Sequence, residues 1–173
     1  MSNFNNYSIE ELEKVLNDIT NKILFDNNIE KPQIYFAGPW FTEKGESLYK
    51  YCQVICKSIE DNHYNVYFPK EHNCPTARQT FESNVEAIKD SEIIIALIDE
   101  KDTGTAWELG LAYAMHKTIF LLVLDETSLK SKTNIMLAYN GTCVKLKDLY
   151  KILQDKTFDL DDLQYDDSWE GKE

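Results

Sequence analysis

From residue 32 onward, short apolar runs alternate with longer segments whose apolar positions repeat at helical spacing. Each short apolar run predicts a β-strand, and the continuous run at 92–98 (EIIIALI) is typical of a parallel strand buried on both faces. The periodic segments between the runs predict helices, whereas 69–77 is predicted to be a loop and 133–140 is ambiguous. The predicted strands are 33–37, 64–68, 92–98, 118–124 and 142–146, and the predicted helices are 43–61, 80–90 and one beginning at Thr105.

This alternation predicts an α/β fold, since strands separated by helices of this length pair in parallel through right-handed crossovers. For five strands, the pattern favours a flavodoxin-like (Rossmann-like) parallel sheet flanked by helices, with strand order 2-1-3-4-5. The crevice of such a sheet opens beyond the carboxyl ends of the first and third strands. We therefore expect the loops 38–44 and 99–105 to face each other across a binding site.

An additional amphipathic helix is predicted ahead of this sheet. Residues 8–25 carry apolar side chains at helical spacing, and Ser8 and Glu11 fit a capping box at its start. Pro32 closes the polar connection that follows. We expect an N-terminal helical extension at 1–31 and one domain at 32–173, with the extra helix packed on the core or at a subunit interface, or else binding a partner.

The turn at 102–110 (DTGTAWELG) contains two carboxylates and connects the third predicted strand to the helix that follows it. Glu108, in the first turn of the predicted helix, would be kept ionised by the helix macrodipole and could act as a nucleophile or base. Asp102 is the second carboxylate. An alternative is purely structural, because Thr105 and Glu108 also fit a capping box in which the glutamate only binds an orphan backbone N–H.

Aromatic residues surround the end of the first predicted strand. Tyr35 lies near that end, while Phe36 is expected to point into the core. Gly38, Trp40 and Phe41 belong to the following GPWF turn, and the two large rings beyond the strand are expected to line a pocket for a flat ligand such as a nucleobase.

Composition narrows the possible partners. The 173 residues carry a net charge of −12, which argues against a nucleic-acid polymer or an anionic membrane surface as partner. No apolar stretch reaches the roughly 20 residues that span a bilayer, and the N-terminus does not resemble a signal peptide, so a cytoplasmic protein is expected. The four cysteines do not have the spacing of a zinc site and are expected to be reduced thiols.

The chemistry of these residues fits displacement at an anomeric carbon, for which a carboxylate nucleophile, a second carboxylate and an aromatic slot are suited. The sequence lacks the glycine-rich loops that hold a triphosphate or a dinucleotide. No serine or cysteine occupies a recognisable nucleophile turn. We expect neither a cofactor nor a metal.

Three segments in this order, IYFAGPWF, DTGTAWELGLAYA and TNIM, resemble the nucleoside 2-deoxyribosyltransferase family over roughly residues 33–146. The resemblance implies that the protein transfers 2-deoxyribose between purine or pyrimidine bases, acting on 2′-deoxyribonucleosides and free nucleobases in nucleoside salvage. It also implies that Glu108 attacks C1′ and forms a deoxyribosyl ester, that Tyr35 orients Glu108, and that Asp102 holds the sugar hydroxyls.

The same resemblance implies a shared site. Asn134 and Met136 match an Asn-x-Met segment that a neighbouring subunit contributes, so a homo-oligomer is expected, built from dimers and with a hexamer as one candidate. Asn84 stands where relatives have an aspartate that exchanges a proton with the base, and a neutral amide cannot do this. Glu82 or Glu86 could take this role only if the helix is rotated or shifted. Tyr165 is the candidate for an aromatic contribution from the C-terminal tail.

Two other functions remain open. A deoxynucleoside or deoxynucleotide N-glycosidase on the same fold would use water as the acceptor. Trp40 and Phe41, with Lys44 as the one cation of the first loop, favour a neutral nucleoside over a 5′-phosphate, although Arg78 is a nearby cation that could overturn this argument. A catalytically silent nucleoside-binding protein is the third reading.

Overall fold

The computed structural model describes residues 32–40, 43–61, 64–98, 102–124, 135–138 and 140–154. These residues contain a five-stranded sheet in the order β2-β1-β3-β4-β5, and every neighbouring pair of strands is parallel. The predicted fold and strand order are confirmed. The strands are β1 (Gln33–Ala37), β2 (Asn65–Tyr67), β3 (Ile93–Leu97), β4 (Thr118–Val123) and β5 (Thr142–Lys145).

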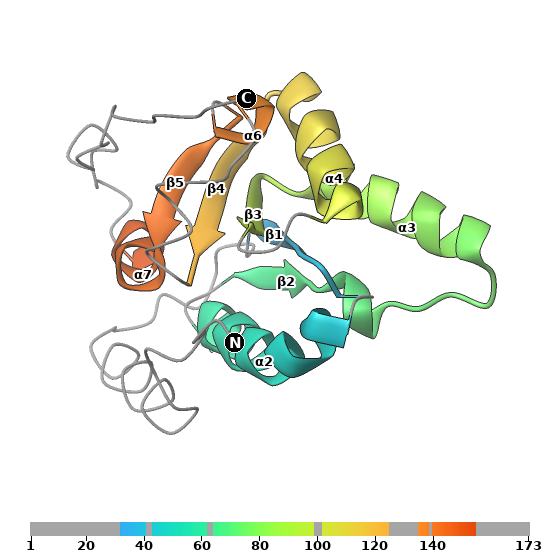
Figure 1. The fold of residues 1–173 in the computed structure, drawn as a ribbon, viewed down its shortest axis with the longest axis horizontal. Coiled ribbons are helices and arrows are strands. Elements are labelled where there is room, and N and C mark those ends of the chain that lie inside the picture. Colours follow the sequence, from blue (N-terminus) through green and yellow to red (C-terminus); the bar gives the residue numbers. More distant parts are fainter. Residues whose placement is uncertain are drawn as a thin grey trace.

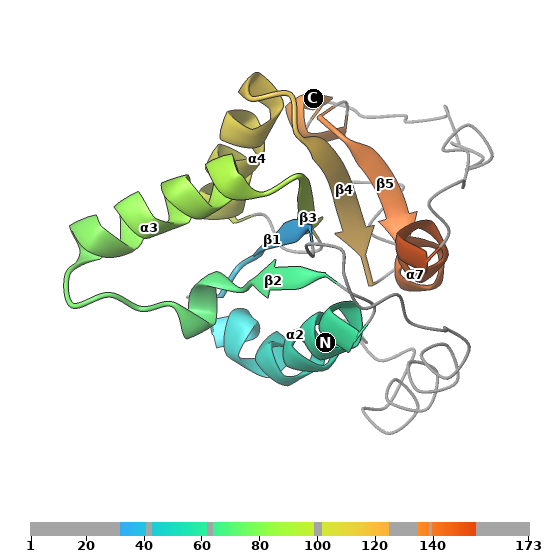
Figure 2. The same cartoon turned by 180° about the vertical axis from the view of Figure 1, so that it is seen from behind.

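Helices cover both faces of this sheet (Figure 1). Helices α2 and α7 contribute to the apolar cluster on one face, and α3 and α4 contribute to the cluster on the other. Figure 2 shows α3 and α4 from behind, close to each other. The helical elements are α2 (Glu43–Asp61), the short 3₁₀ helix η1 (Pro69–Glu71), α3 (Ala77–Asp90), α4 (Thr103–Ala114), α6 (Ile135–Ala138) and α7 (Leu146–Gln154).

Successive residues of the central strands alternate between the two apolar clusters. Ile34 and Phe36 of β1 face the α2 and α7 side, whereas Tyr35 and Ala37 face the α3 and α4 side. All four are completely buried. A strand covered on both faces needs apolar side chains at every position, because each buried large side chain stabilises the fold by about 1.5–3 kcal/mol. This explains why the strand sequences are continuously apolar.

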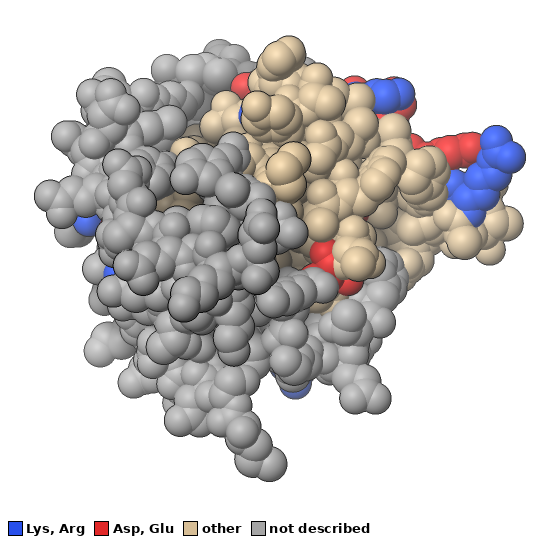
Figure 3. All heavy atoms as spheres, turned by 45° about the horizontal axis from the view of Figure 1, so that its top comes forward, with Lys and Arg blue, Asp and Glu red and all other residues tan. Residues whose placement is uncertain are grey.

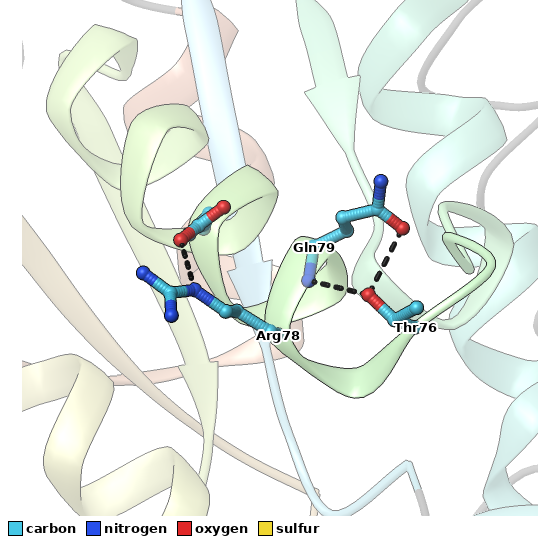
Figure 4. A network of polar contacts seen from close by, with 4 residues as sticks. Thr76, Arg78 and Gln79 are labelled. Atoms are coloured by element: carbon cyan, nitrogen blue, oxygen red, sulfur yellow. Dashed lines mark hydrogen bonds and ion pairs between the residues drawn. The ribbon is translucent and has the colours of Figure 1, made fainter.

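Two helices begin earlier than the sequence pattern predicts. Helix α3 starts at Ala77 because the hydroxyl oxygen of Thr76 accepts a hydrogen bond from the Gln79 N–H at 3.2 Å (Figure 4). Helix α4 starts at Thr103, and its N-cap is Asp102 rather than Thr105. The alternative interpretation, a capping box of Thr105 and Glu108, is therefore wrong. The ambiguous segment contains the single-turn helix α6, and the predicted N-terminal helix lies outside the described residues.

Helix α4 ends in a Schellman motif. The Lys117 N–H donates to the Ala112 carbonyl at 3.1 Å, and the His116 N–H donates to the Tyr113 carbonyl at 3.0 Å. His116 takes a left-handed conformation with φ 55°, at a position where glycine is usual. Its side chain is exposed.

Among the described residues, no helix combines the length and apolar character needed to cross a membrane. The cysteines are free thiols, two of them buried and two partly buried. The described part of the chain contains no cluster of three or more histidine, cysteine, aspartate or glutamate side chains able to hold a metal ion.

Candidate active site

The centre of the candidate site is a hydrogen bond between a phenol and a carboxylate. The Tyr35 hydroxyl donates to Oε1 of Glu108 at 2.6 Å. Tyr35 comes from β1 and Glu108 from α4, the helix that follows β3, and β1 and β3 are neighbours in the sheet. Sequence order therefore reverses at this point, which is where ligands bind in open parallel sheets. The predicted convergence of these two residues is confirmed.

Burial changes the acid–base behaviour of both partners. Loss of water raises the pKa of Glu108 from 4.5 to about 7; the hydrogen bond from Tyr35 partly offsets this, and the nearby charge of Asp102 adds to it. Burial, together with the negative charge of Glu108, raises the pKa of Tyr35 well above its usual value. Tyr35 is therefore a permanent hydrogen-bond donor at neutral pH, and Glu108 changes its charge near pH 7.

This result corrects the expected role of the helix dipole. Glu108 lies six residues after the N-cap Asp102, in the second turn of α4, and the first turn contains no acidic residue. The dipole effect falls off within the first turn. The prediction that the dipole keeps Glu108 ionised is wrong, because desolvation dominates its electrostatics.

Asp102 has a structural role at the start of α4. Its Oδ2 accepts hydrogen bonds from the Thr105 N–H at 2.7 Å and from the Thr105 hydroxyl at 2.9 Å. The side chain is only partly buried, and its other oxygen, Oδ1, accepts no hydrogen bond from the described residues. One oxygen thus fixes the helix start, while the second is available to a ligand beside Glu108.

Trp40 does not line the pocket as predicted. Its side chain is 2 % exposed and lies in the apolar cluster under α2, where its ring stacks on Phe36 at 5.5 Å and meets Phe68 edge-on at 4.8 Å. Its indole N–H donates to the Phe36 carbonyl. An indole ring just after the end of a strand can still reach the hydrophobic core. Burying its large apolar area there stabilises the fold more than leaving the ring exposed in a pocket.

The position of Trp40 also accounts for Gly38. A Cβ atom on Gly38 would lie 2.7 Å from Cε2 of the Trp40 indole and closer still to two other ring atoms. Glycine is therefore required here by close packing. The predicted core position of Phe36 is confirmed, since it is completely buried.

Two further aromatic residues, which the sequence pattern alone did not single out, extend the site. Tyr67 of β2 is the register partner of Tyr35, and the two rings stack at 5.5 Å with an interplanar angle of 11°. His72, just after η1, stacks on Tyr67 at 4.1 Å, also at 11°. The predicted strand order already places the second strand beside the first, so pairing the two Tyr-Phe segments, 35–36 and 67–68, in register could have revealed Tyr67.

Asn84 of α3 belongs to the same cluster. Its Oδ1 accepts a hydrogen bond from the Tyr67 hydroxyl at 3.1 Å, and that hydroxyl also shares a hydrogen bond with Ser83 at 2.8 Å. Asn84 thus lies next to the ring that stacks on Tyr35. The neutral amide has no acidic proton to give.

Of the remaining residues that the sequence singled out for the site, the structure describes Met136 and Arg78. Phe41, Asn134 and Tyr165 lie outside the described residues. Met136 of α6 is 76 % exposed. Arg78 of α3 is exposed and forms an ion pair with Glu82 at 2.8 Å (Figure 4).

The fold and the site together define a doubly wound α/β protein with a buried carboxylate–phenol pair at its switch point. The family model described as nucleoside 2-deoxyribosyltransferase matches residues 34–159. The chain belongs to the nucleoside 2-deoxyribosyltransferase family, a family of enzymes that act on deoxynucleosides and nucleobases.

One sequence relative agrees with this assignment, and two solved structures share the fold. The chain is 29% identical over 114 residues to the nucleoside deoxyribosyltransferase of Lactobacillus leichmannii, an alignment that covers 56% of this chain and 73% of the relative. A 2-deoxyribosyltransferase from Bacillus psychrosaccharolyticus has a similar structure, with a TM-score of 0.55 and 22% identity over 73% of this chain and 92% of the other. A CMP N-glycosidase from Clostridium botulinum shares the fold, with a TM-score of 0.52 and 19% identity over 70% and 97% of the two chains.

Proposed function

We propose that this protein transfers 2-deoxyribose between nucleobases through a covalent ester on Glu108. The observation that carries the proposal is the 2.6 Å hydrogen bond from the Tyr35 hydroxyl to Oε1 of Glu108 at the switch point of the sheet. This bond leaves Oε2 of the carboxylate to attack a carbon atom. Membership of the family supports a deoxyribosyl donor as the substrate.

In the first half of the reaction, ionised Glu108 attacks C1′ of a 2′-deoxyribonucleoside as the bond to the base breaks. The electron pair of that bond leaves with the base, and a deoxyribosyl ester forms on the glutamate. Tyr35 holds the carboxylate in one orientation, which saves the entropy cost of ordering it during the reaction. In this proposal, the oxygen of Asp102 that does not bind Thr105 accepts a hydrogen bond from a sugar hydroxyl.

In the second half, a nitrogen of another base attacks C1′ and the ester bond electrons return to Glu108. Two inversions then give net retention at the anomeric carbon. The raised pKa of Glu108 suits both halves, because a carboxylate with a pKa of about 7 is a better nucleophile than an ordinary one, yet still leaves readily from the ester.

A transfer assay tests this proposal. The protein is incubated with 2′-deoxyinosine and adenine, and the products are separated by chromatography. Deoxyadenosine is expected. Hypoxanthine without deoxyadenosine would show hydrolysis instead, and no turnover of any deoxynucleoside would show a binding protein.

Two matched variants locate the nucleophile. Glu108→Ala is expected to abolish transfer, whereas Glu82→Ala, which removes an exposed glutamate of α3, should leave it unchanged. Circular dichroism controls for the fold. Full activity of the Glu108 variant would refute the assignment of the nucleophile.

One observation favours nucleotide N-glycosidase activity as a second candidate. Trp40 is turned into the core and does not fill the first loop, and the Lys70 ammonium donates to the Trp40 carbonyl at 3.1 Å. A cation is thus present at this loop, which weakens the argument against a 5′-phosphate. The same assay with 2′-deoxyinosine 5′-monophosphate distinguishes the two functions. Faster release of the base from the nucleotide than from the nucleoside, with no transfer product, would favour the hydrolase.

We also propose that the protein works as a homo-oligomer with sites shared between subunits. Figure 3 shows that much of the described surface on this side lacks charged groups. The exposed large apolar side chains lie on α3, α4 and α6, and Phe81 and Trp107 contact each other at 5.3 Å. In a chain with a net charge of −12, an uncharged face is where two copies meet with least repulsion. These residues are Phe81, Trp107, Tyr113 and Met136.

Under this proposal Asn134 and Met136 reach the site of a neighbouring subunit, and Phe41 and Tyr165 complete the pocket around the base. Sedimentation equilibrium should give the mass of at least a dimer, with dimers or a hexamer as the expected species. Trp107→Glu should lower that mass and the activity together. A fully active monomer would refute the shared site.

A further inference from the structure

We propose that His72 is the proton donor and acceptor on the base side of this site. In this role its imidazole protonates the departing nucleobase and later takes the proton of the incoming one. The inference rests on the proposed function, because it assigns a residue to the reaction of Glu108. It derives from a stack of three aromatic rings that connects His72 with the Tyr35–Glu108 pair.

The stack has a defined order. The ring centroids of His72 and Tyr67 lie 4.1 Å apart, and those of Tyr67 and Tyr35 lie 5.5 Å apart. The interplanar angle is 11° in both pairs. Tyr35 and Tyr67 are register partners on neighbouring strands, so their rings stack from strand to strand. Strand β2 is the edge strand of the described sheet, and His72 follows it along the chain after the short helix η1. It follows the carboxyl end of β2, at the same sheet edge as the crevice.

The reaction needs an acid at this place. A nucleobase that departs with the electrons of the glycosidic bond is a poor leaving group until it receives a proton. The Tyr35 hydroxyl donates its hydrogen bond to Glu108, and the Tyr67 hydroxyl donates one to the amide oxygen of Asn84. Asp102 is an acceptor for Thr105. The imidazole of His72 has two ring nitrogens and can give a proton and later take one back.

The surroundings of His72 leave its ring accessible. Its side chain is exposed, and Tyr67 covers one face. The Cys74 thiol contacts the His72 carbonyl at 3.9 Å, and the α3 side chains that bind Tyr67 are both neutral. The Glu71 carboxylate accepts two hydrogen bonds from α2, and the Lys70 ammonium binds the loop after β1. These two neighbouring charges are each engaged with another element.

The proton balance closes over the two half-reactions. As Oε2 of Glu108 bonds to C1′, the bond from C1′ to the base breaks, and the imidazolium of His72 gives its proton to the base. The neutral imidazole then accepts the N–H proton of the second base as that base attacks C1′. The ester bond breaks, its electrons return to Glu108, and His72 is again protonated. No other reactant is consumed.

Two substrates that differ in their need for a proton test this role. Release of hypoxanthine from 2′-deoxyinosine requires an acid, whereas 7-methyl-2′-deoxyguanosine carries a cationic base that departs without one. Single-turnover release with excess enzyme isolates the first half-reaction. For His72→Gln we expect a loss of about 100-fold or more on 2′-deoxyinosine and less than about 10-fold on the methylated substrate.

Free imidazole supplies a second measurement. Added imidazole should restore part of the 2′-deoxyinosine reaction in His72→Ala, which a purely structural role would not allow. His116→Asn is the matched control, because it removes another exposed imidazole at the far end of α4, and it should be unchanged in both measurements.

The possible failures can be told apart. Equal losses of the His72→Gln variant on both substrates, or no loss on either, would overturn the role of His72 while leaving that of Glu108 intact. Absence of rescue by imidazole would likewise overturn it. Release of no base by the unsubstituted protein from either substrate would instead refute the proposed function itself.

Discussion

Replacing Glu108 by glutamine should stabilise the fold while it abolishes the reaction. The pKa of Glu108 is raised from 4.5 to about 7, chiefly by burial. The folded state therefore keeps a proton that the unfolded chain has lost between pH 4.5 and 7. Because the folded pKa lies above the unfolded one, this group lowers stability progressively as the pH rises through that window.

The magnitude follows from the shift. A difference of roughly 2.5 pH units at about 1.4 kcal/mol per unit gives about 3 kcal/mol of lost stability above pH 7. Glutamine has nearly the same shape, its amide oxygen can still accept the hydrogen bond from Tyr35, and it carries no charge. Glu108→Gln should thus have nearly unchanged stability at pH 4.5 and be about 3 kcal/mol more stable at pH 8. For a chain of this size the melting temperature at pH 8 should rise by about 6–12 °C.

Urea unfolding of both proteins at half-unit steps from pH 4.5 to 8 measures this difference directly. The other carboxylates titrate equally in both proteins, so their contributions cancel in the difference between the two free energies of unfolding. Glu82→Gln, at an exposed ion pair, is the control and should change stability by less than about 0.5 kcal/mol at any pH. A stability difference that does not grow with pH would refute the reasoning, because Glu108 would then be neither desolvated nor raised in pKa.

Three other substitutions test separate parts of the structure. Tyr35→Phe removes the hydrogen bond that lowers the pKa of Glu108, so the acid limb of kcat/KM should move about 1–2 units upward from pH 7, and an unmoved limb would show that the bond does not tune the nucleophile. Gly38→Ala should cost about 1–3 kcal/mol by collision with Trp40, and a double-mutant cycle with Trp40→Leu should recover part of that loss; additive effects would contradict the packing argument. His116→Gly should raise stability by about 0.5–1 kcal/mol because it relieves the left-handed conformation, which thermal unfolding measures against His116→Ala; equal stability of the two variants would argue against strain at this position.

Much of the fold could be predicted from periodicity. Each central strand is apolar at consecutive positions because it is covered on both faces, and this signal is local. The alternation of these strands with helices then restricts the topology to few choices, and the observed order is the common one. Helix starts were less predictable, since Thr76 and Asp102 act as caps only when their side chains reach a particular backbone N–H.

The sequence also located the centre of the site, because strand order alone brings the ends of β1 and β3 together. It did not determine which way a side chain turns. Trp40 lies in the core because Phe36 and Phe68, from different strands, form a surface that the indole fills. The charge state of Glu108 was missed for a similar reason, as desolvation depends on atoms from several elements and not on position in one helix.

By itself, then, the sequence determined which elements form, how the sheet is ordered and which two residues meet at its switch point. These properties follow from local periodicity and from the few topologies that parallel strands allow. Only the tertiary structure decided that Glu108 titrates near neutrality, that Trp40 belongs to the core, and that Tyr67 and His72 continue the site beyond Tyr35. Burial and ring stacking are the physical reason, because both depend on side chains that lie far apart in the chain.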